Sequence, residues 1–146
     1  DGADYHFVTD AAFQRLVAED GLLEHATVYG RRYGVPKQQV LDKLAEGFDV
    51  YVRTDVQGAA SIKRLMPHAV LVFIAPGSLD ELEARLRARN ADDDAQIARR
   101  MHTAREEMAR VDEFEHVIVN AAGQLAAAVD RLAEVLEAER IARQRR

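Results

Sequence analysis

From Gly47 onward, short apolar runs alternate with segments whose apolar residues have helical spacing. The clearest run, residues 69–75 (AVLVFIA), is continuously apolar, which is typical of a strand buried on both faces of a parallel sheet. Further strands are expected at residues 50–53 and 116–119. Because strands that alternate with helices pair in parallel, the sequence predicts the α/β class with a mostly parallel sheet.

The first part of the chain predicts a short strand at residues 5–8, a helix at 10–19 and a two-stranded ribbon at 22–33 that turns at Gly30. Thr9 is well placed to cap the helix, because its hydroxyl can accept from an amide of the first turn. The apolar residues expected on one face of this helix are Phe13, Leu16 and Val17.

The later helices have recognisable first residues. Pro36 suits the start of a helix that continues to Leu44, since its fixed φ matches the helical value. Ser78 and Glu81 have the spacing of a capping box, in which each side chain satisfies an amide of the other. Further helices are expected at residues 56–66, from 92–94 to about 111, and from 123 onward.

Composition excludes several classes of protein. The formal net charge of −5 argues against a nucleic-acid-binding protein, which usually has a basic face. The absence of cysteine rules out disulfides and thiolate metal sites, and it fits a cytoplasmic location. No apolar run approaches the roughly 20 residues of a membrane span, so we expect no membrane partner. Because the sequence begins at Asp1 without a Met, we expect a fragment or a processed chain.

Ligands bind parallel α/β sheets at the carboxyl ends of the strands. This rule selects Asp55, residues 76–78 and Asn120, each of which follows an expected strand. Each also has a simpler explanation, because Asp55 can cap the next helix and Asn120 can form a turn. Glu24 lies a few residues before a Tyr-Gly-Val-Pro turn, where it is either a binding carboxylate or an ordinary surface carboxylate.

Six segments of the chain resemble guanylate kinase in their order and spacing, and the resemblance extends from residue 1 to about 137. It implies transfer of a phosphoryl group from ATP to GMP, giving ADP and GDP, with Mg²⁺ accompanying the ATP. It also implies a P-loop NTPase-like three-layer fold with a small mixed GMP-binding subdomain and a helical lid. The six segments are residues 4–8 (DYHFV), 23–26 (LEHA), 30–34 (GRRYG), 55–58 (DVQG), 85–100 and 117–120 (VIVN).

The resemblance divides the chain into four functional parts. Residues 1–36 are the C-terminal part of the GMP-binding subdomain, and residues 37–84 belong to the core. Residues 85–104 form the lid, and residues 105–146 complete the core with a C-terminal helix. The first strand and the phosphate-binding loop are expected before Asp1, because no G-x-x-x-x-G-K-[ST] motif occurs in the sequence.

The substrate residues follow from the same resemblance. Guanine presents N1–H and N2–H₂ side by side, and an ionised carboxylate offers two acceptors at matching separation, so Glu24 with Asp55 is expected to bind the base. Tyr5 and Tyr33 are expected to contact the GMP phosphate, although both could be ordinary half-buried strand aromatics. Without the phosphate-binding loop, the chain alone is expected to have negligible turnover.

The lid arginines are expected to stabilise the transferred phosphoryl group, and Asn120 is expected to contact the adenine of ATP. Arg85 and Arg89 share a helix face at i and i+4, and Arg100 lies on the following helix. The chain is rich in arginine, so a surface role is the competing explanation. Arg87, Arg99 and Arg105 are assigned to the surface for this reason.

Three positions depart from the family pattern, namely Val35, Arg53 and Asn90, and we assign no metal or base contact to the first two. The five histidines lack metal-ligand spacing, so no metal is assigned to protein side chains. Two other functions stay open. One is a non-catalytic guanylate-kinase-like module that binds protein, and the other is a related kinase acting on a phosphorylated sugar.

Overall fold

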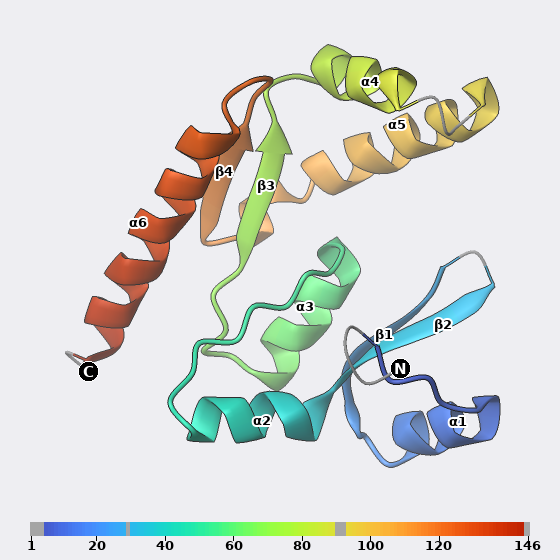
Figure 1. Ribbon diagram of the computed structural model, residues 1–146, viewed down its shortest axis with the longest axis vertical. Coiled ribbons are helices and arrows are strands. Elements are labelled where there is room, and N and C mark those ends of the chain that lie inside the picture. Colours follow the sequence, from blue (N-terminus) through green and yellow to red (C-terminus); the bar gives the residue numbers. More distant parts are fainter. Residues whose placement is uncertain (1–4, 29, 90–92, 145–146) are drawn as a thin grey trace. The chain divides into compact units, whose positions relative to one another are not determined.

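The computed structural model describes residues 5–28, 30–89 and 93–144 (Figure 1). Its contacts divide the chain into two units, Asp1–Ala69 and Val70–Arg146, and each unit is described below by itself. Both units combine helices with a two-stranded sheet, so the chain has a mixed α/β architecture. Asn90, where the sequence departs from the family pattern, lies outside the described residues. The four-part functional division stays a prediction.

The first unit is built around an antiparallel ribbon, as expected. The turn between its strands contains Gly30 at φ 76°, a left-handed conformation that costs glycine little. Buried Leu23, Val40 and Ile62 form its core, one from the ribbon and two from the helices that cover it. The elements are α1 (Asp10–Ala18), β1 (Leu22–Val28), β2 (Arg31–Pro36), α2 (Lys37–Ala45) and α3 (Val56–Leu65).

The strand register gives the ribbon two distinct faces. Paired residues lie on the same face, and successive residues alternate between faces. Glu24 pairs with Val35 and Ala26 pairs with Tyr33, so these four residues share one face. The opposite face packs on α1, where the Phe13 ring meets the His25 ring edge-on with centroids 6.3 Å apart. Glu24 and Tyr33 therefore point away from α1.

The structure confirms the predicted helix α1 and its Thr9 cap. The Thr9 hydroxyl accepts from the Ala12 amide at 3.2 Å, and Phe13 is buried. Leu16 is half-buried, whereas Val17 on the same face is exposed. Val17 shares the face of Phe13 by its i+4 spacing, but it lies in the last turn of α1, which ends at Ala18.

Two expected strands are absent from the part of the chain that the structure describes. Residues 5–8 and 50–53 have no strand hydrogen-bonded to them among the described residues. Val50 and Val52 nevertheless pack against the core of the first unit, while Tyr51 between them is 66% exposed. The alternation of a strand is present at residues 50–52, but a strand assignment also needs a hydrogen-bonded neighbour.

The second unit contains the parallel pair β3 and β4, with residues 72–76 in register with residues 116–120. Helix α6 runs beside β4 (Figure 1), and Ile118 packs there with Ala128 and Val135. Leu86 of α4 packs against Ile97 and Met101 of α5. The elements are β3 (Val72–Pro76), α4 (Leu79–Ala88), α5 (Asp94–Met108), the short 3-10 helix η1 (Val111–Glu113), β4 (His116–Asn120) and α6 (Leu125–Gln144).

Burial of β3 differs from the prediction for a strand covered on both faces. Phe73 and Ala75 are buried, and the Phe73 ring meets the Phe114 ring with centroids 5.1 Å apart. Ile74 is 51% exposed, so the expectation for residues 69–75 was wrong on that face. A continuous apolar run reports the hydrophobicity of a strand, but not whether a second layer covers it. None of the helices in the described segments is long and apolar enough to cross a membrane.

Candidate functional site

Glu24 and Asp55 meet at the first turn of α3. A Cβ atom added at Gly58 would lie 2.8 Å from Glu24 Cγ and 3.1 Å from Glu24 Cδ, so the Glu24 side chain lies directly against this glycine. Asp55 Oδ1 accepts from the amides of Gln57 at 3.0 Å and Gly58 at 2.8 Å. Both carboxylates therefore lie at the amino end of one helix, although they come from segments about thirty residues apart in the sequence.

The two carboxylates interact electrostatically. Partial burial raises the pKa of Glu24, the negative charge of Asp55 raises it further, and His25 acts in the opposite direction. The Glu24 carboxylate makes no hydrogen bond to another described residue, and neither does Asp55 Oδ2. A partly desolvated carboxylate beside a like charge favours a ligand that brings hydrogen-bond donors.

Asp55 also caps the helix that follows it, which is the simpler role that the sequence left open. It is the N-cap of α3, and both capping hydrogen bonds use the same oxygen, Oδ1. The second oxygen, Oδ2, is therefore not required by the helix. Capping and ligand binding are compatible at this residue because they need different atoms.

The two tyrosines lie on the same side of the ribbon as Glu24. Tyr33 shares the Glu24 face of the ribbon, and the Tyr5 ring meets it edge-on with centroids 6.1 Å apart. Tyr5 is 55% exposed and Tyr33 is 41% exposed, so both rings are open to solvent on one side. The four residues expected to bind GMP thus form two pairs, Glu24 with Asp55 and Tyr5 with Tyr33, and Tyr33 shares the Glu24 face of the ribbon.

In the second unit, Arg85 is held against the carboxyl end of β4. Its Nη2 atom donates to the Asn120 carbonyl oxygen at 2.8 Å and forms an ion pair with Glu81. Arg85 also lines a cavity of about 230 Å³ with Asn120 and residues of β3 and α5. Arg85 and Asn120 are therefore in direct contact. They are two of the four residues predicted to bind ATP or its transferred phosphoryl group, the others being Arg89 and Arg100.

Arg89 and Arg100 are not joined to Arg85 by a hydrogen bond or ion pair in the described segments. Arg89 is the C-cap of α4 and is exposed, and Arg100 is exposed on α5. The roles expected for these two arginines stay predictions.

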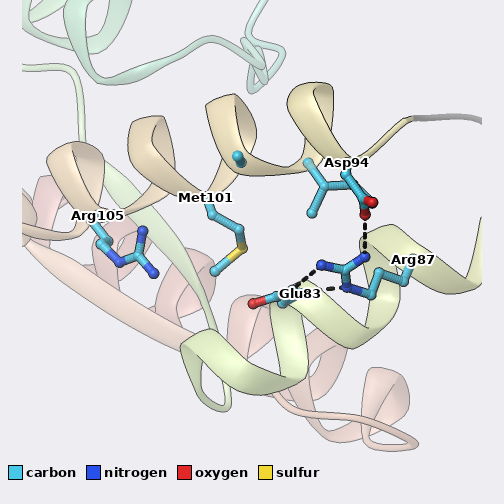
Figure 2. A pocket seen from close by; sticks show the side chains of 7 residues that line it. Glu83, Arg87, Asp94, Met101 and Arg105 are labelled. Carbon is cyan, nitrogen blue, oxygen red and sulfur yellow. Dashed lines mark hydrogen bonds and ion pairs between the residues drawn. The ribbon is translucent and has the colours of Figure 1, made fainter.

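Arg87 connects the two helices that the sequence predicts as the lid. Figure 2 shows its guanidinium between Glu83 and Asp94. Its Nε and Nη2 atoms donate to Glu83 at 3.0 and 2.8 Å, and Nη1 donates to Asp94 of α5 at 2.7 Å. These hydrogen bonds raise the pKa of Arg87. A cavity of about 220 Å³ lies beside them, lined by Glu83, Arg87, Asp94, Ile97, Ala98, Met101 and Arg105.

Sequence reasoning placed Arg87 at the surface and missed this connection. The i and i+4 spacing of Glu83 and Arg87 was visible in the sequence, and such pairs are favourable on a helix. The contact with Asp94 was not visible, because it depends on how α4 and α5 pack together. Arg87 is thus a structural residue of the helix pair.

The chain belongs to the guanylate kinase family, whose sequence profile matches residues 1–139. It is 47% identical over 120 residues to guanylate kinase from Nitrosococcus oceani, covering 82% of this chain and 59% of the relative. It is 47% identical over 136 residues to the Gloeobacter violaceus enzyme, covering 93% and 65%. The crystal structure of guanylate kinase from Anaplasma phagocytophilum superimposes with a TM-score of 0.71 at 34% identity, covering 95% and 66%. The chain thus spans about three fifths to two thirds of the length of these relatives.

Proposed function

We propose that this chain supplies the GMP site and the lid of an ATP:GMP phosphotransferase. The observation that carries the proposal is the meeting of Glu24 and Asp55 at the first turn of α3, where the Glu24 carboxylate has no hydrogen-bond partner among the described residues. Membership of the guanylate kinase family supports it. We place the chain in the P-loop three-layer architecture and in the cytoplasm on the same basis.

The Glu24 carboxylate accepts from N1–H and N2–H₂ of guanine, and Asp55 assists from its free oxygen. Adenine has an acceptor at N1, so it would face an unpaired, partly buried carboxylate. A good bidentate contact with a base edge discriminates by about 1–3 kcal/mol in nucleic-acid recognition. Leaving Glu24 unpaired against the wrong base adds to that penalty. This pocket therefore selects guanine.

The tyrosine hydroxyls of Tyr5 and Tyr33 donate to the phosphate of GMP. Both rings lie on the Glu24 side of the ribbon with one side open to solvent, so their hydroxyl groups are accessible to a ligand bound there. One face of the ribbon then holds the base at one end and the phosphate at the other.

The second unit serves the phosphates of ATP. Arg85, Arg89 and Arg100 balance the negative charge that spreads over the transferred phosphoryl group, and Asn120 contacts the adenine. A GMP phosphate oxygen attacks the γ-phosphorus in line, and the bond from that phosphorus to ADP breaks. The phosphate-cradling loop is not in this sequence, so turnover requires it from elsewhere in the whole protein.

ATP carries Mg²⁺ in this family, and we assign no protein ligand to it. In the described ranges, no three His, Cys, Asp or Glu side chains come together in a way that could hold a metal ion. No step above depends on the ion.

Calorimetric titration of the chain with GMP, AMP and a phosphopeptide tests the proposal. We expect heat with GMP, little with AMP, and weaker binding of GMP in Glu24→Gln. Glu19→Gln is the matched control, because it makes the same change at an exposed residue at the end of α1. Binding of the phosphopeptide alone would instead favour the non-catalytic protein-binding module.

A further inference from the structure

The side chain of Glu81 does not complete the capping box that its spacing predicts. The Ser78 hydroxyl accepts from the Glu81 amide at 3.1 Å, which is one half of the motif. In the described chain, the Glu81 carboxylate does not accept from the Ser78 amide and instead pairs with Arg85 one turn further along α4. The acidic residue is therefore available for another role.

The carboxylate of Glu81 is held in a confined place. Its side chain is only 22% exposed, and Oε1 is buried without a hydrogen bond among the described residues, so it relies on the ion pair with Arg85 Nη2. A Cβ atom at Gly77 would overlap Glu81 Oε2. Glycine at residue 77 thus makes room for the carboxylate beside the end of β3.

Both contacts of Arg85 use one nitrogen atom. Nη2 reaches Glu81 and the Asn120 carbonyl oxygen, whereas Nε and Nη1 have no hydrogen bond or ion pair within the described segments. A guanidinium is planar and rigid, so fixing one nitrogen at two points also fixes the directions of the other donors. The edge of the Arg85 guanidinium that carries Nε and Nη1 is consequently held in one orientation.

We propose that Glu81 is a positioning residue for Arg85, which it anchors through Nη2 so that Nε and Nη1 are presented to phosphate oxygens. This inference rests on the proposed role of Arg85 in phosphate binding. An anchored guanidinium loses less side-chain entropy when a phosphate binds than a freely rotating one. Glu81 therefore strengthens phosphate binding despite its own negative charge.

The sign of the effect separates positioning from simple electrostatics. Removing an acidic group near an anion site would, by charge alone, tighten the binding of a polyanion. If Glu81 instead occupied Arg85 and withheld it, removal would also tighten binding. Of these three electrostatic roles for Glu81, only positioning predicts weaker binding when Glu81 is lost.

The test is a double-mutant cycle on the 146-residue chain with inorganic tripolyphosphate as the probe, measured by calorimetry near physiological salt. We expect Arg85→Ala to weaken binding about tenfold and Glu81→Ala about threefold to fivefold, as for a charge-assisted contact that is partly exposed. In the Arg85→Ala background, Glu81→Ala should change affinity less than about twofold, because its partner is gone. Glu83→Ala, an acid two residues along α4 that pairs with Arg87, is the control and should not weaken binding.

Glu81→Gln, which keeps the side-chain volume, repeats the test should the alanine variant fold poorly. If Arg85→Ala binds tripolyphosphate as well as the unchanged chain, the proposed role of Arg85 fails and the inference fails with it. If Arg85→Ala weakens binding while both Glu81 variants bind equally well or more tightly, only the positioning role is overturned. Equal losses from Glu81→Ala in both backgrounds would also overturn it, because they would indicate a purely structural effect.

Discussion

Replacing Gly58 by alanine is the smallest change that should push the Glu24 carboxylate away from the first turn of α3. The added Cβ would overlap Thr54 Oγ1 and lie 2.8 Å from Glu24 Cγ and 3.1 Å from Glu24 Cδ. The Asp55 cap would survive, because it uses the amide of residue 58 rather than its side chain. The variant therefore changes the position of one carboxylate and leaves the other in place.

Two opposing terms determine the stability of Gly58→Ala. Alanine in place of glycine inside a helix stabilises by about 0.5–1 kcal/mol, whereas overpacking against Thr54 costs about 1–3 kcal/mol. Introducing Thr54→Ala first removes the overlapping hydroxyl, so that only the flexible Glu24 side chain must move. In that background, Gly58→Ala should leave stability unchanged or slightly raised.

In the Thr54→Ala background, Gly58→Ala should nevertheless lower the affinity for GMP. Losing good geometry at a bidentate base contact costs about 1–3 kcal/mol, and 1.4 kcal/mol corresponds to tenfold, so we expect about a tenfold loss. Calorimetry gives the affinity, and urea denaturation gives the free energy of unfolding. The reasoning is refuted if Thr54→Ala with Gly58→Ala binds GMP as tightly as Thr54→Ala alone.

Three further predictions concern charge. Since the pKa of Glu24 is raised in the folded chain, the folded chain holds the carboxyl proton more tightly than the unfolded chain does. Stability therefore falls as the pH rises from the ordinary glutamate pKa through the raised pKa of folded Glu24. Glu24→Gln should remove this loss, so urea denaturation should find the variant more stable at neutral pH, with the difference vanishing below the ordinary glutamate pKa. Asp55→Asn keeps the cap but removes the like charge, so an NMR titration should find a lower pKa for Glu24; an unchanged value would contradict the interaction. Arg87→Met should speed amide exchange in the first turn of α5 while the thermal midpoint shifts little, and equal acceleration in the exposed control Arg99→Met would contradict the link to Asp94.

Local features of the fold were predictable because they depend on neighbours in the sequence. Thr9 caps α1, Gly30 forms the ribbon turn and Asp55 caps α3, each through contacts within a few residues. The meeting of Glu24 with Asp55 was expected from the family resemblance. Its geometry was not, because it depends on the β1–β2 register and on the packing of α3 against the ribbon.

The failures of prediction have a common physical cause. An apolar segment indicates that burial is favourable, but pairing and coverage depend on other parts of the molecule. Residues 50–53 have the side-chain alternation of a strand without a paired neighbour among the described residues, and Ile74 is exposed in an apolar run. Glu81 is a further case in which a local pattern did not give the contact that forms. Its spacing from Ser78 predicted a capping box, whereas in the structure its carboxylate pairs with Arg85.

Selectivity between GMP and inosine monophosphate tests most directly whether Glu24 binds the base. Inosine monophosphate keeps N1–H but lacks the N2 amino group, so it removes one of the two adjacent donors. Calorimetry should show the unchanged chain preferring GMP by about tenfold, as expected for one charge-assisted hydrogen bond, and this preference should largely disappear in Glu24→Gln. An equal preference for GMP in the chain and in Glu24→Gln would contradict the account, because the base would then be recognised by other residues.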